Sequence, residues 1–255
     1  MYELTGIEVS HQGRRVLAIQ RLTLAENAFT VILGHNGSGK STLMGLLARQ
    51  QSPTLGEIRL EGRPLSSYSQ RKLARMIAYL PQRLPEVAGL NVRELCGLGR
   101  FPWRGALGRW RPEDHRAVDE ALEQTGMSGF AEQLVDDLSG GERQRAWIAM
   151  LLAQQAPILL LDEPLSALDI THQLEVLILL RELNTTAGRG ILLILHDVNL
   201  AARFASRVIA LKAGRVVFDA APERLMEPVS LREIYGVEFD LIQHPRRQIP
   251  VAVLT

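Results

Sequence analysis

The stretch Gly34-His-Asn-Gly-Ser-Gly-Lys40-Ser41, directly after the β-branched run Thr30-Val-Ile32, decides the expected fold. It reads G-x-x-x-x-G-K-S, the pattern of a phosphate-binding loop between a strand and a helix. Its glycines let backbone N–H groups converge on phosphate oxygens, Lys40 neutralises the β- and γ-phosphate charge, and the Ser41 hydroxyl can ligate Mg²⁺. The helical pattern that follows points its positive dipole end at the same phosphates. The residues predicted to bind the nucleotide here are Gly34, His35, Asn36, Gly37, Ser38, Gly39, Lys40, Ser41 and Thr42.

Two carboxylates follow a second apolar run, Ile158–Leu161, as Asp162-Glu163-Pro164. An all-apolar strand is typical of a parallel sheet buried on both faces, and ligands bind beyond the carboxyl ends of such strands. This position predicts that Asp162 belongs to the Mg²⁺ site and that Glu163 polarises an attacking water. The alternative is an acidic pair that only caps the next element, and the phosphate loop in the same chain argues against it.

A third motif, Leu138-Ser-Gly-Gly-Glu142-Arg-Gln144, precedes a helical stretch with the composition of a largely buried helix. Ser139 can cap this helix, and Gly140 and Gly141 permit close backbone approach. A helix cap without a ligand is the simpler interpretation. The order of the three motifs, however, resembles that of the ATP-binding cassette (ABC) family, in which L-S-G-G-x-x-Q lies between the Walker A loop and the Walker B strand.

This resemblance implies roles for three further residues. Gln82, after Met76–Leu80 and Pro81, looks like the Q-loop glutamine that contacts Mg²⁺ and water and senses the membrane partner. Asp169 looks like the D-loop aspartate. His196, after the predicted strand Ile191–Leu195, looks like the switch histidine that contacts the γ-phosphate, whereas a histidine alone would more often be structural.

Two departures from the family pattern stand out. Cassettes usually stack adenine on an aromatic side chain upstream of the phosphate loop, but Val9–Arg15 offers only His11, so an imidazole or an arginine plane would have to serve. Glu142 also replaces the commoner glutamine of the signature. A hydrogen bond donated by that amide must therefore be replaced or lost.

The resemblance implies an α/β fold of the P-loop NTPase class. It comprises a RecA-like core, an antiparallel β subdomain and a helical subdomain, within a single ABC ATPase domain spanning residues 1–255. The sequence agrees, because Tyr2–Leu33 and Gly56–Leu60 read as short strands and Val208–Phe218 reads as a hairpin. Residues 84–155 are expected to form the helical lobe, with Pro112 at a helix start.

Composition sets limits on the function. With 255 residues, 46% of them hydrophobic, the chain can bury one large core or two lobes. A net charge of +1 and a pI of about 8.0 argue against a broad nucleic-acid surface, for which a pI above about 9 is typical. No stretch reaches the roughly 18 apolar residues of a membrane span, and Met1–Gly6 does not resemble a secretory signal. The single cysteine, Cys96, excludes an internal disulfide and indicates a core residue in a cytosolic chain.

A closer kinship is indicated by Gly99–Trp110, Leu134–Met150 and Ile234-Tyr-Gly236, which resemble the ATPases of ferric siderophore importers, most of all those of ferric hydroxamate (ferrichrome) uptake. The resemblance implies a homodimer, peripheral on the cytoplasmic face of a bacterial inner membrane. Its partners would be permease subunits and, through them, a periplasmic siderophore-binding protein. Importers of other iron chelates, haem or vitamin B12 have similar ATPases and remain alternatives.

The implied mechanism binds two Mg-ATP molecules between head-to-tail subunits, with Lys40 and Ser41 of one subunit and Ser139 and Gly141 of the other at each site. Glu163 orients the attacking water and His196 steadies the γ-phosphate. A soluble cassette of DNA repair would need a long coiled-coil insertion, and none is seen. A translation-factor cassette would carry two copies of the motifs, and a subunit without turnover would be expected to lack Glu163 or His196.

The stretch Gln82–Trp110 is expected to receive a short cytoplasmic helix of the permease, with aromatic and arginine anchors that include Phe101, Trp103 and Arg104. The alternative places the large aromatic side chains, Trp110 among them, in the core of the helical lobe.

Overall fold

The chain forms two units, and the first is built from both ends of the sequence. Unit 1 comprises Met1–Ser67 and Gly190–Thr255, and unit 2 comprises Tyr68–Arg189. The structure, a computed structural model, describes residues 1–105, 108–244 and 250–254. Within those residues, no helix has the length and apolar character needed to cross a membrane.

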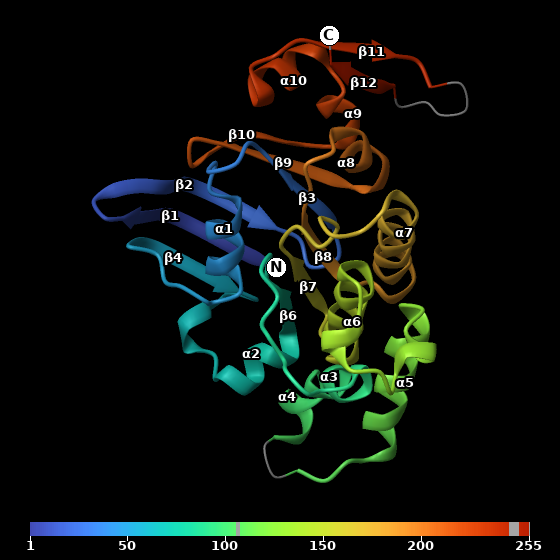
Figure 1. The fold of residues 1–255 in the computed structure, drawn as a ribbon. Coiled ribbons are helices and arrows are strands. Elements are labelled where there is room, and N and C mark those ends of the chain that lie inside the picture. The colour runs from blue at the N-terminus through green and yellow to red at the C-terminus, as the bar shows by residue number, and fades with distance from the viewer. Residues whose placement is uncertain (106–107, 245–249, 255) are drawn as a thin grey trace. The chain divides into compact units, whose positions relative to one another are not determined.

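An antiparallel sheet occupies the N-terminal part of unit 1. Its strands run in the order β2-β1-β4-β5 and are β1 (Tyr2–His11), β2 (Arg14–Leu24), β4 (Leu55–Leu60) and β5 (Arg63–Pro64) (Figure 1). Gln12 and Gly13 join β1 to β2 with positive φ at both positions, which suits the twist of a two-residue hairpin. Leu4 and Leu17 are buried, consistent with one face of the sheet being packed. The predicted short strands are confirmed.

A second group of strands in unit 1 is mainly parallel. β3 (Phe29–Leu33) lies between β8 (Gly190–Ile194) and β9 (Arg207–Lys212) and is parallel to both, while β10 (Arg215–Ala220) pairs antiparallel with β9. Every residue of β3 and of β8 is buried, which explains why their sequences read as continuous apolar runs. The predicted hairpin is therefore β9–β10, and the strand predicted at 191–195 begins and ends one residue earlier.

The helices of unit 1 follow these strands, and a C-terminal hairpin completes it. The remaining elements are α1 (Lys40–Leu47), η1 (Leu65–Ser67), α8 (Val198–Phe204), α9 (Pro222–Leu225), α10 (Pro228–Tyr235), β11 (Phe239–Ile242) and β12 (Val251–Leu254). β11 pairs antiparallel with β12. Helix α10 buries Leu231 and Ile234 and ends at Gly236, whose left-handed conformation stops the helix.

Unit 2 contains two parallel strands and most of the helices. β6 (Ile77–Leu80) pairs with β7 (Ile158–Leu161), with Leu80 opposite Leu161. The helices are α2 (Gln70–Met76), α3 (Val92–Leu98), α4 (Phe101–Arg104), α5 (Pro112–Gln124), η2 (Ser128–Phe130), η3 (Val135–Asp137), α6 (Gly140–Ala153) and α7 (Ile170–Ala187). Pro112 is the first residue of α5, as predicted, because a proline at the first position sacrifices no helical hydrogen bond.

Candidate nucleotide site

The phosphate loop lies between β3 and α1 in unit 1, where the sequence places it. Gly34 has φ 140°, and a Cβ at this position would lie 2.2 Å from the Leu211 carbonyl oxygen. Gly39, with φ 102°, precedes the first residue of α1. Glycine is therefore required here by the backbone conformation and, at Gly34, also by the close approach of β9.

Lys40 and Ser38 give the loop its polar groups. The Lys40 side chain is almost fully buried, and its Nζ donates to the carbonyls of Gly34 at 2.8 Å and His35 at 3.0 Å. The Ser38 hydroxyl is also buried and, within the described residues, has no hydrogen-bond partner. A Cβ on Gly37 would meet nothing within 4 Å. A buried donor without a partner beside open backbone is what an anionic phosphate group would satisfy.

His196 lies beyond the end of β8, the strand next to β3. The Leu195 N–H donates to the Ile32 carbonyl at 3.2 Å. The residue before His196 is therefore paired with β3, the strand that precedes the phosphate loop. Asp197 then caps α8, accepting from the backbone N–H of Asn199 and Leu200. The cap fixes the turn that presents His196.

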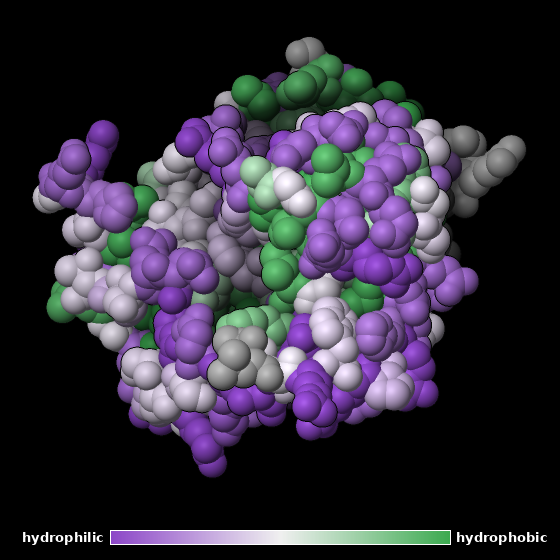
Figure 2. All heavy atoms as spheres, turned by 60° about the horizontal axis from the view of Figure 1, so that its bottom comes forward, coloured by the Kyte–Doolittle hydropathy of each residue, from purple (hydrophilic) through white to green (hydrophobic). Residues whose placement is uncertain are grey.

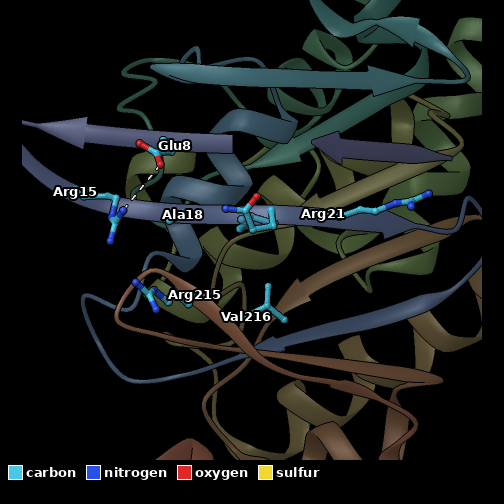
Figure 3. Close-up of a pocket in the computed structure, with 8 residues that line it drawn as sticks. Glu8, Arg15, Ala18, Arg21, Arg215 and Val216 are labelled. Carbon is cyan, nitrogen blue, oxygen red and sulfur yellow. Dashed lines mark ion pairs between the residues drawn. The ribbon is translucent and has the colours of Figure 1, made fainter. Parts of the chain in front are cut away.

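His11 ends β1 and is exposed, with its Nδ1 at 3.4 Å from the Ser10 carbonyl. A hollow of about 390 Å³ lies on the neighbouring strands, lined by the exposed residues Arg15, Arg21 and Arg215 and by Glu8 (Figure 3). Glu8 and Arg15 form an ion pair at 3.9 Å. Because the hollow is open and its charges are solvated, it has the character of a polar sheet face. His11 therefore stays a prediction for adenine stacking.

In unit 2, Asp162 and Glu163 follow β7, and Gln82 follows β6. The Asp162 N–H donates to the Leu80 carbonyl at 2.9 Å, which continues the strand pairing beyond β7. The Gln82 amide then donates to Glu163 Oε2 at 2.7 Å. Two residues 81 positions apart in the sequence are thus brought into contact, as expected from neighbouring parallel strands.

The two carboxylates have different environments. Asp162 is almost fully buried, and its charge adds to the effect of burial in raising the pKa of Tyr79 to about 12. Glu163 has φ 52°, a left-handed conformation that is unfavourable for a residue with a side chain. Backbone strain of this kind gathers at functional sites, where the surrounding structure holds it in place.

Ser139 caps α6, as predicted, and Glu142 completes a capping box. The Glu142 N–H donates to Ser139 Oγ at 3.4 Å, and the Ser139 N–H donates to Glu142 Oε2 at 2.9 Å. The bond from the Ser139 hydroxyl, followed by that from its N–H, lowers the pKa of Glu142. The glutamate therefore accepts a hydrogen bond at the helix start, a role that the pattern S-x-x-E could have predicted.

Gly140 and Gly141 are not required by the packing of unit 2. A Cβ on Gly140 would lie 4.0 Å from the Ala167 side chain, and one on Gly141 would lie 3.5 Å from Leu168. Both are ordinary contacts, so packing within unit 2 would accommodate a side chain at either position. Asp169 caps α7 by accepting from the N–H and Nδ1 of His172, and these bonds lower the pKa of Asp169.

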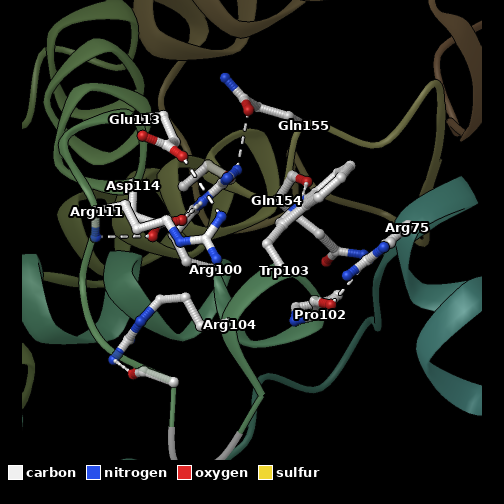
Figure 4. Close-up of polar contacts among 12 residues, drawn as sticks. Arg75, Arg100, Pro102, Trp103, Arg104, Arg111, Glu113, Asp114, Gln154 and Gln155 are labelled. Carbon is white, nitrogen blue, oxygen red and sulfur yellow. Dashed lines mark hydrogen bonds and ion pairs between the residues drawn. The ribbon is translucent and has the colours of Figure 1, made fainter.

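The segment containing Trp103 is tied into the helices of unit 2. Trp103 Nε1 donates to the Gln154 carbonyl at 2.8 Å (Figure 4). The guanidinium groups of Arg75 and Arg100 lie 4.8 and 5.3 Å from the centre of its ring. Arg100 is buried and pairs with the buried Asp114 at 2.9 Å. Trp103 is therefore anchored by these contacts, although 37% of it stays exposed.

Other large side chains of this segment stay exposed. Trp110 stacks on Arg104, whose guanidinium lies 3.9 Å from the ring centre. Leu98 is 50% exposed and Phe101 is 57% exposed. Figure 2 looks from the α3–α5 end, where hydrophilic atoms surround smaller hydrophobic groups. Ala106 and Leu107 of the predicted permease-binding stretch lie outside the described residues.

The relatives of this chain include ATP-binding proteins of iron-chelate uptake. It is 42% identical over 245 residues to the ferric enterobactin transport ATP-binding protein of Escherichia coli (strain K12), covering 93% of this chain and 90% of that protein. It is 39% identical over 245 residues to the iron(3+)-hydroxamate import ATP-binding protein of Bacillus subtilis (strain 168), covering 96% and 91%.

Among solved structures, a dimeric ATP-binding cassette in a post-hydrolysis state, bound to ADP and Pi, matches with a TM-score of 0.78 and 29% identity. That match covers 87% of this chain and 99% of the cassette. The sequence profile of the family described as ABC transporter matches residues 17–166. The chain therefore belongs to the ABC transporter family and is one of its ATPase subunits.

Proposed function

We propose that this chain energises the uptake of ferric hydroxamate siderophores, such as ferrichrome, from the cytoplasmic face of a bacterial inner membrane. The coarser function, ATPase of an iron-siderophore or haem importer, follows from the relatives together with the family match. The resemblance of Gly99–Trp110 and Ile234-Tyr-Gly236 to hydroxamate ATPases supports the finer one. Another iron chelate, haem or vitamin B12 is the alternative cargo.

ATP binding is carried above all by one observation, the phosphate loop with its buried Lys40 and its unpartnered Ser38 hydroxyl. Lys40 and the loop amides would hold the phosphates, since a nest of N–H groups beside a buried ammonium favours a polyanion. We infer that Mg²⁺ would be held by the oxygen atoms of Ser41, Gln82 and Asp162, which are the hard ligands it prefers, and that it would neutralise phosphate charge when bound.

For hydrolysis, we infer that Glu163 orients the water that attacks the γ-phosphorus. Its hydrogen bond from Gln82 orients the carboxylate. His196 would donate to the γ-phosphate, so that charge in the loose transition state is stabilised mainly by positioned groups. The bond from the γ-phosphorus to the β–γ bridging oxygen breaks as the bond to water forms.

A second copy of the chain would complete each site. The room beside Gly140 and Gly141 supports this, because glycine there is not needed within unit 2 and an approaching phosphate would need it. Ser139 and Gly141 of the second copy would face the γ-phosphate, with Asp169 nearby at the dimer interface. We infer that closure and reopening of this dimer would move the permease, which captures its cargo from a periplasmic binding protein.

We also propose that residues 84–155 act as the helical lobe that meets the permease, with Phe101 as its most exposed aromatic anchor. The observation behind this is that Phe101 is 57% exposed, whereas Trp103 is 37% exposed and its indole N–H is bonded to the Gln154 carbonyl. Phe101→Glu should reduce co-purification with the permease and leave nucleotide binding to the separate subunit intact. Glu120→Gln, an exposed change on α5, is the matched control. Unchanged co-purification would place the contact elsewhere.

The cargo is tested in proteoliposomes that contain this chain, its permease and the binding protein. ATP hydrolysis and iron uptake are measured with ferrichrome, ferric enterobactin, ferric citrate, haem and vitamin B12, each at the same concentration. The proposal expects the largest stimulation with ferrichrome. Stimulation by another chelate alone would replace the hydroxamate assignment and leave the iron-import ATPase intact.

A further inference from the structure

The C-terminal end of helix α10 lies against the phosphate loop. The Tyr235 carbonyl is 3.0 Å from Nε2 of His35, a loop residue 200 positions earlier in the sequence. The Glu233 carbonyl accepts from Lys212 Nζ at 2.6 Å. The last carbonyls of a helix have no partner within the helix, so the bonds from these two side chains satisfy them. The negative end of the helix dipole also favours such donors.

The contact fixes the tautomer and orientation of His35. Because a carbonyl oxygen only accepts, Nε2 must carry the hydrogen. The imidazole also meets the Tyr235 ring edge to face, at 5.6 Å between centres, and Tyr235 meets Phe239 of β11 at the same distance. Burial, with the Asp197 carboxylate adding to it, raises the pKa of Tyr235 to about 12, so this ring stays uncharged. Three rings thus connect the loop to the C-terminal hairpin.

The loop is held at other points by the β9–β10 hairpin. The Gly214 N–H donates to the Ser38 carbonyl at 3.0 Å, and Gly34 packs against the Leu211 carbonyl. The His35 carbonyl accepts from Lys40 Nζ. His35 is therefore bound on two sides, its backbone by the predicted phosphate-binding lysine and its side chain by α10. Helix α10 is itself anchored by two completely buried side chains, Leu231 and Ile234.

We propose that His35 is a positioning residue for ATP: the carbonyl of Tyr235 holds its side chain so that the loop amides keep the geometry that binds phosphate. This inference rests on the assignment of residues 34–42 to the ATP phosphates. A loop ordered in advance does not lose conformational entropy on binding, so the contact strengthens affinity for the nucleotide. It does not touch the groups assigned to hydrolysis, and the rate of the bound complex should depend on it little.

The test compares two substitutions of His35 in the full chain. His35→Phe keeps a ring against Tyr235 and removes the donor, while His35→Gln removes the ring and places an amide N–H near the position of Nε2. Mg-ATP affinity is measured by calorimetry on the purified chain, and kcat and KM are measured in the reconstituted transporter. His35→Phe should weaken affinity and raise KM about 3- to 10-fold, the value of one hydrogen bond, with kcat within about twofold. His35→Gln should recover most of the loss.

Lys212→Met provides a second variant, because it removes the other donor to α10 and keeps a long apolar side chain. It should weaken affinity in the same direction. Glu233→Gln changes only an exposed side chain of the same helix and is the matched control. The proposal would be overturned if His35→Phe bound Mg-ATP as tightly as the parent chain. It would also be overturned if His35→Gln lost as much affinity as His35→Phe, because that would mean that the ring contacts the nucleotide directly. A chain that binds no Mg-ATP before substitution would overturn the nucleotide assignment instead.

Discussion

Glu163 is the residue on which turnover is expected to depend most. Glu163→Gln should bind Mg-ATP and hydrolyse it about 10² to 10⁴-fold more slowly, the range for a positioned acid or base. The amide retains the size of the side chain and loses the charge that polarises water, so the closed dimer should also accumulate. Steady-state phosphate release and size-exclusion chromatography with ATP measure the two effects.

Glu120→Gln serves as the control for that experiment, because Glu120 is an exposed residue of α5. Its hydrolysis rate should equal that of the parent chain. If Glu163→Gln released phosphate at a rate within a few-fold of the parent, another group would have to polarise the attacking water.

Cys96 is expected to be unreactive in the folded chain. Burial raises its pKa from 9.0 to about 12, while Arg93 lowers it and Asp119 raises it. Iodoacetamide needs the thiolate, so labelling at pH 8 should be slow in the native protein and complete in denaturant, as followed by mass spectrometry. The raised pKa adds stability below pH 9 that is lost as pH rises toward 12. Rapid native labelling at pH 8 would show that the thiol is accessible.

The cap of helix α6 separates a structural role from a catalytic one. Ser139→Ala removes the acceptor for the Glu142 N–H and should lower the free energy of unfolding by about 1 kcal/mol. Ser139→Asp keeps an acceptor at the cap, so stability should change less, but its charge would oppose a γ-phosphate and turnover should fall. Urea unfolding and ATPase assays on the same preparations measure the two quantities. Full activity of Ser139→Asp would argue that this helix start does not face phosphate.

The contact between Arg100 and Asp114 joins α4 to α5 and should dominate the stability of this part of unit 2. Asp114→Ala leaves a buried guanidinium without its carboxylate and should cost about 3–5 kcal/mol in urea unfolding. Replacing both residues, by Arg100→Met with Asp114→Leu, should cost less, because no buried charge remains. The exposed pair of Arg93 and Asp119 is the matched comparison, and Asp119→Ala should cost about 0–1 kcal/mol. Similar losses at Asp114 and Asp119 would contradict the buried-pair account.

Elements with a strong local pattern could be predicted from the sequence. β7 occupies the predicted Ile158–Leu161, and α5 begins at the predicted Pro112, because an apolar run and a proline each determine local structure. The secondary structure at the C-terminal end of the chain was harder to predict from the sequence. Helix α10 and the pair β11–β12 are short, and their burial depends on contacts with distant residues that no local pattern encodes. Trp103 is similar, because its neighbour Arg75 comes from α2 and its hydrogen-bond partner Gln154 follows α6.

The whole assembly is expected to contain two composite sites, and mixed dimers test this. Lys40→Ala and Gly141→Asp should each abolish hydrolysis as homodimers, the first by loss of phosphate charge compensation and the second by adding a carboxylate where phosphate approaches. In a mixed dimer, one site carries both lesions and the other carries neither. Partial ATPase activity should therefore return when the two variants are mixed with the permease. Parental activity of both homodimers would show that the motifs do not share a site.

The residues of the candidate site were more predictable than the contacts that hold them in place. The residue types of the phosphate loop and of the acidic pair can be read from spacing, since phosphate and Mg²⁺ chemistry restrict them. The contact of His35 with Tyr235 joins residues 200 positions apart and uses a backbone carbonyl. It could not be predicted, because no pattern of side chains in the sequence encodes a bond to a backbone carbonyl. The bond from Gln82 to Glu163 lies between these cases, because only the order of parallel strands makes it expected.

The left-handed backbone at Glu163 has a consequence for engineering this protein. Glycine suits φ 52° better than glutamate does, so Glu163→Gly would relieve a local cost of about 1–2 kcal/mol, partly offset by the greater freedom of glycine in the unfolded chain. A selection for thermal tolerance alone would therefore favour losing the side chain assigned to hydrolysis. Stabilised variants of this ATPase would have to be screened for turnover at every round. At this position, thermal stability favours glycine and hydrolysis requires glutamate.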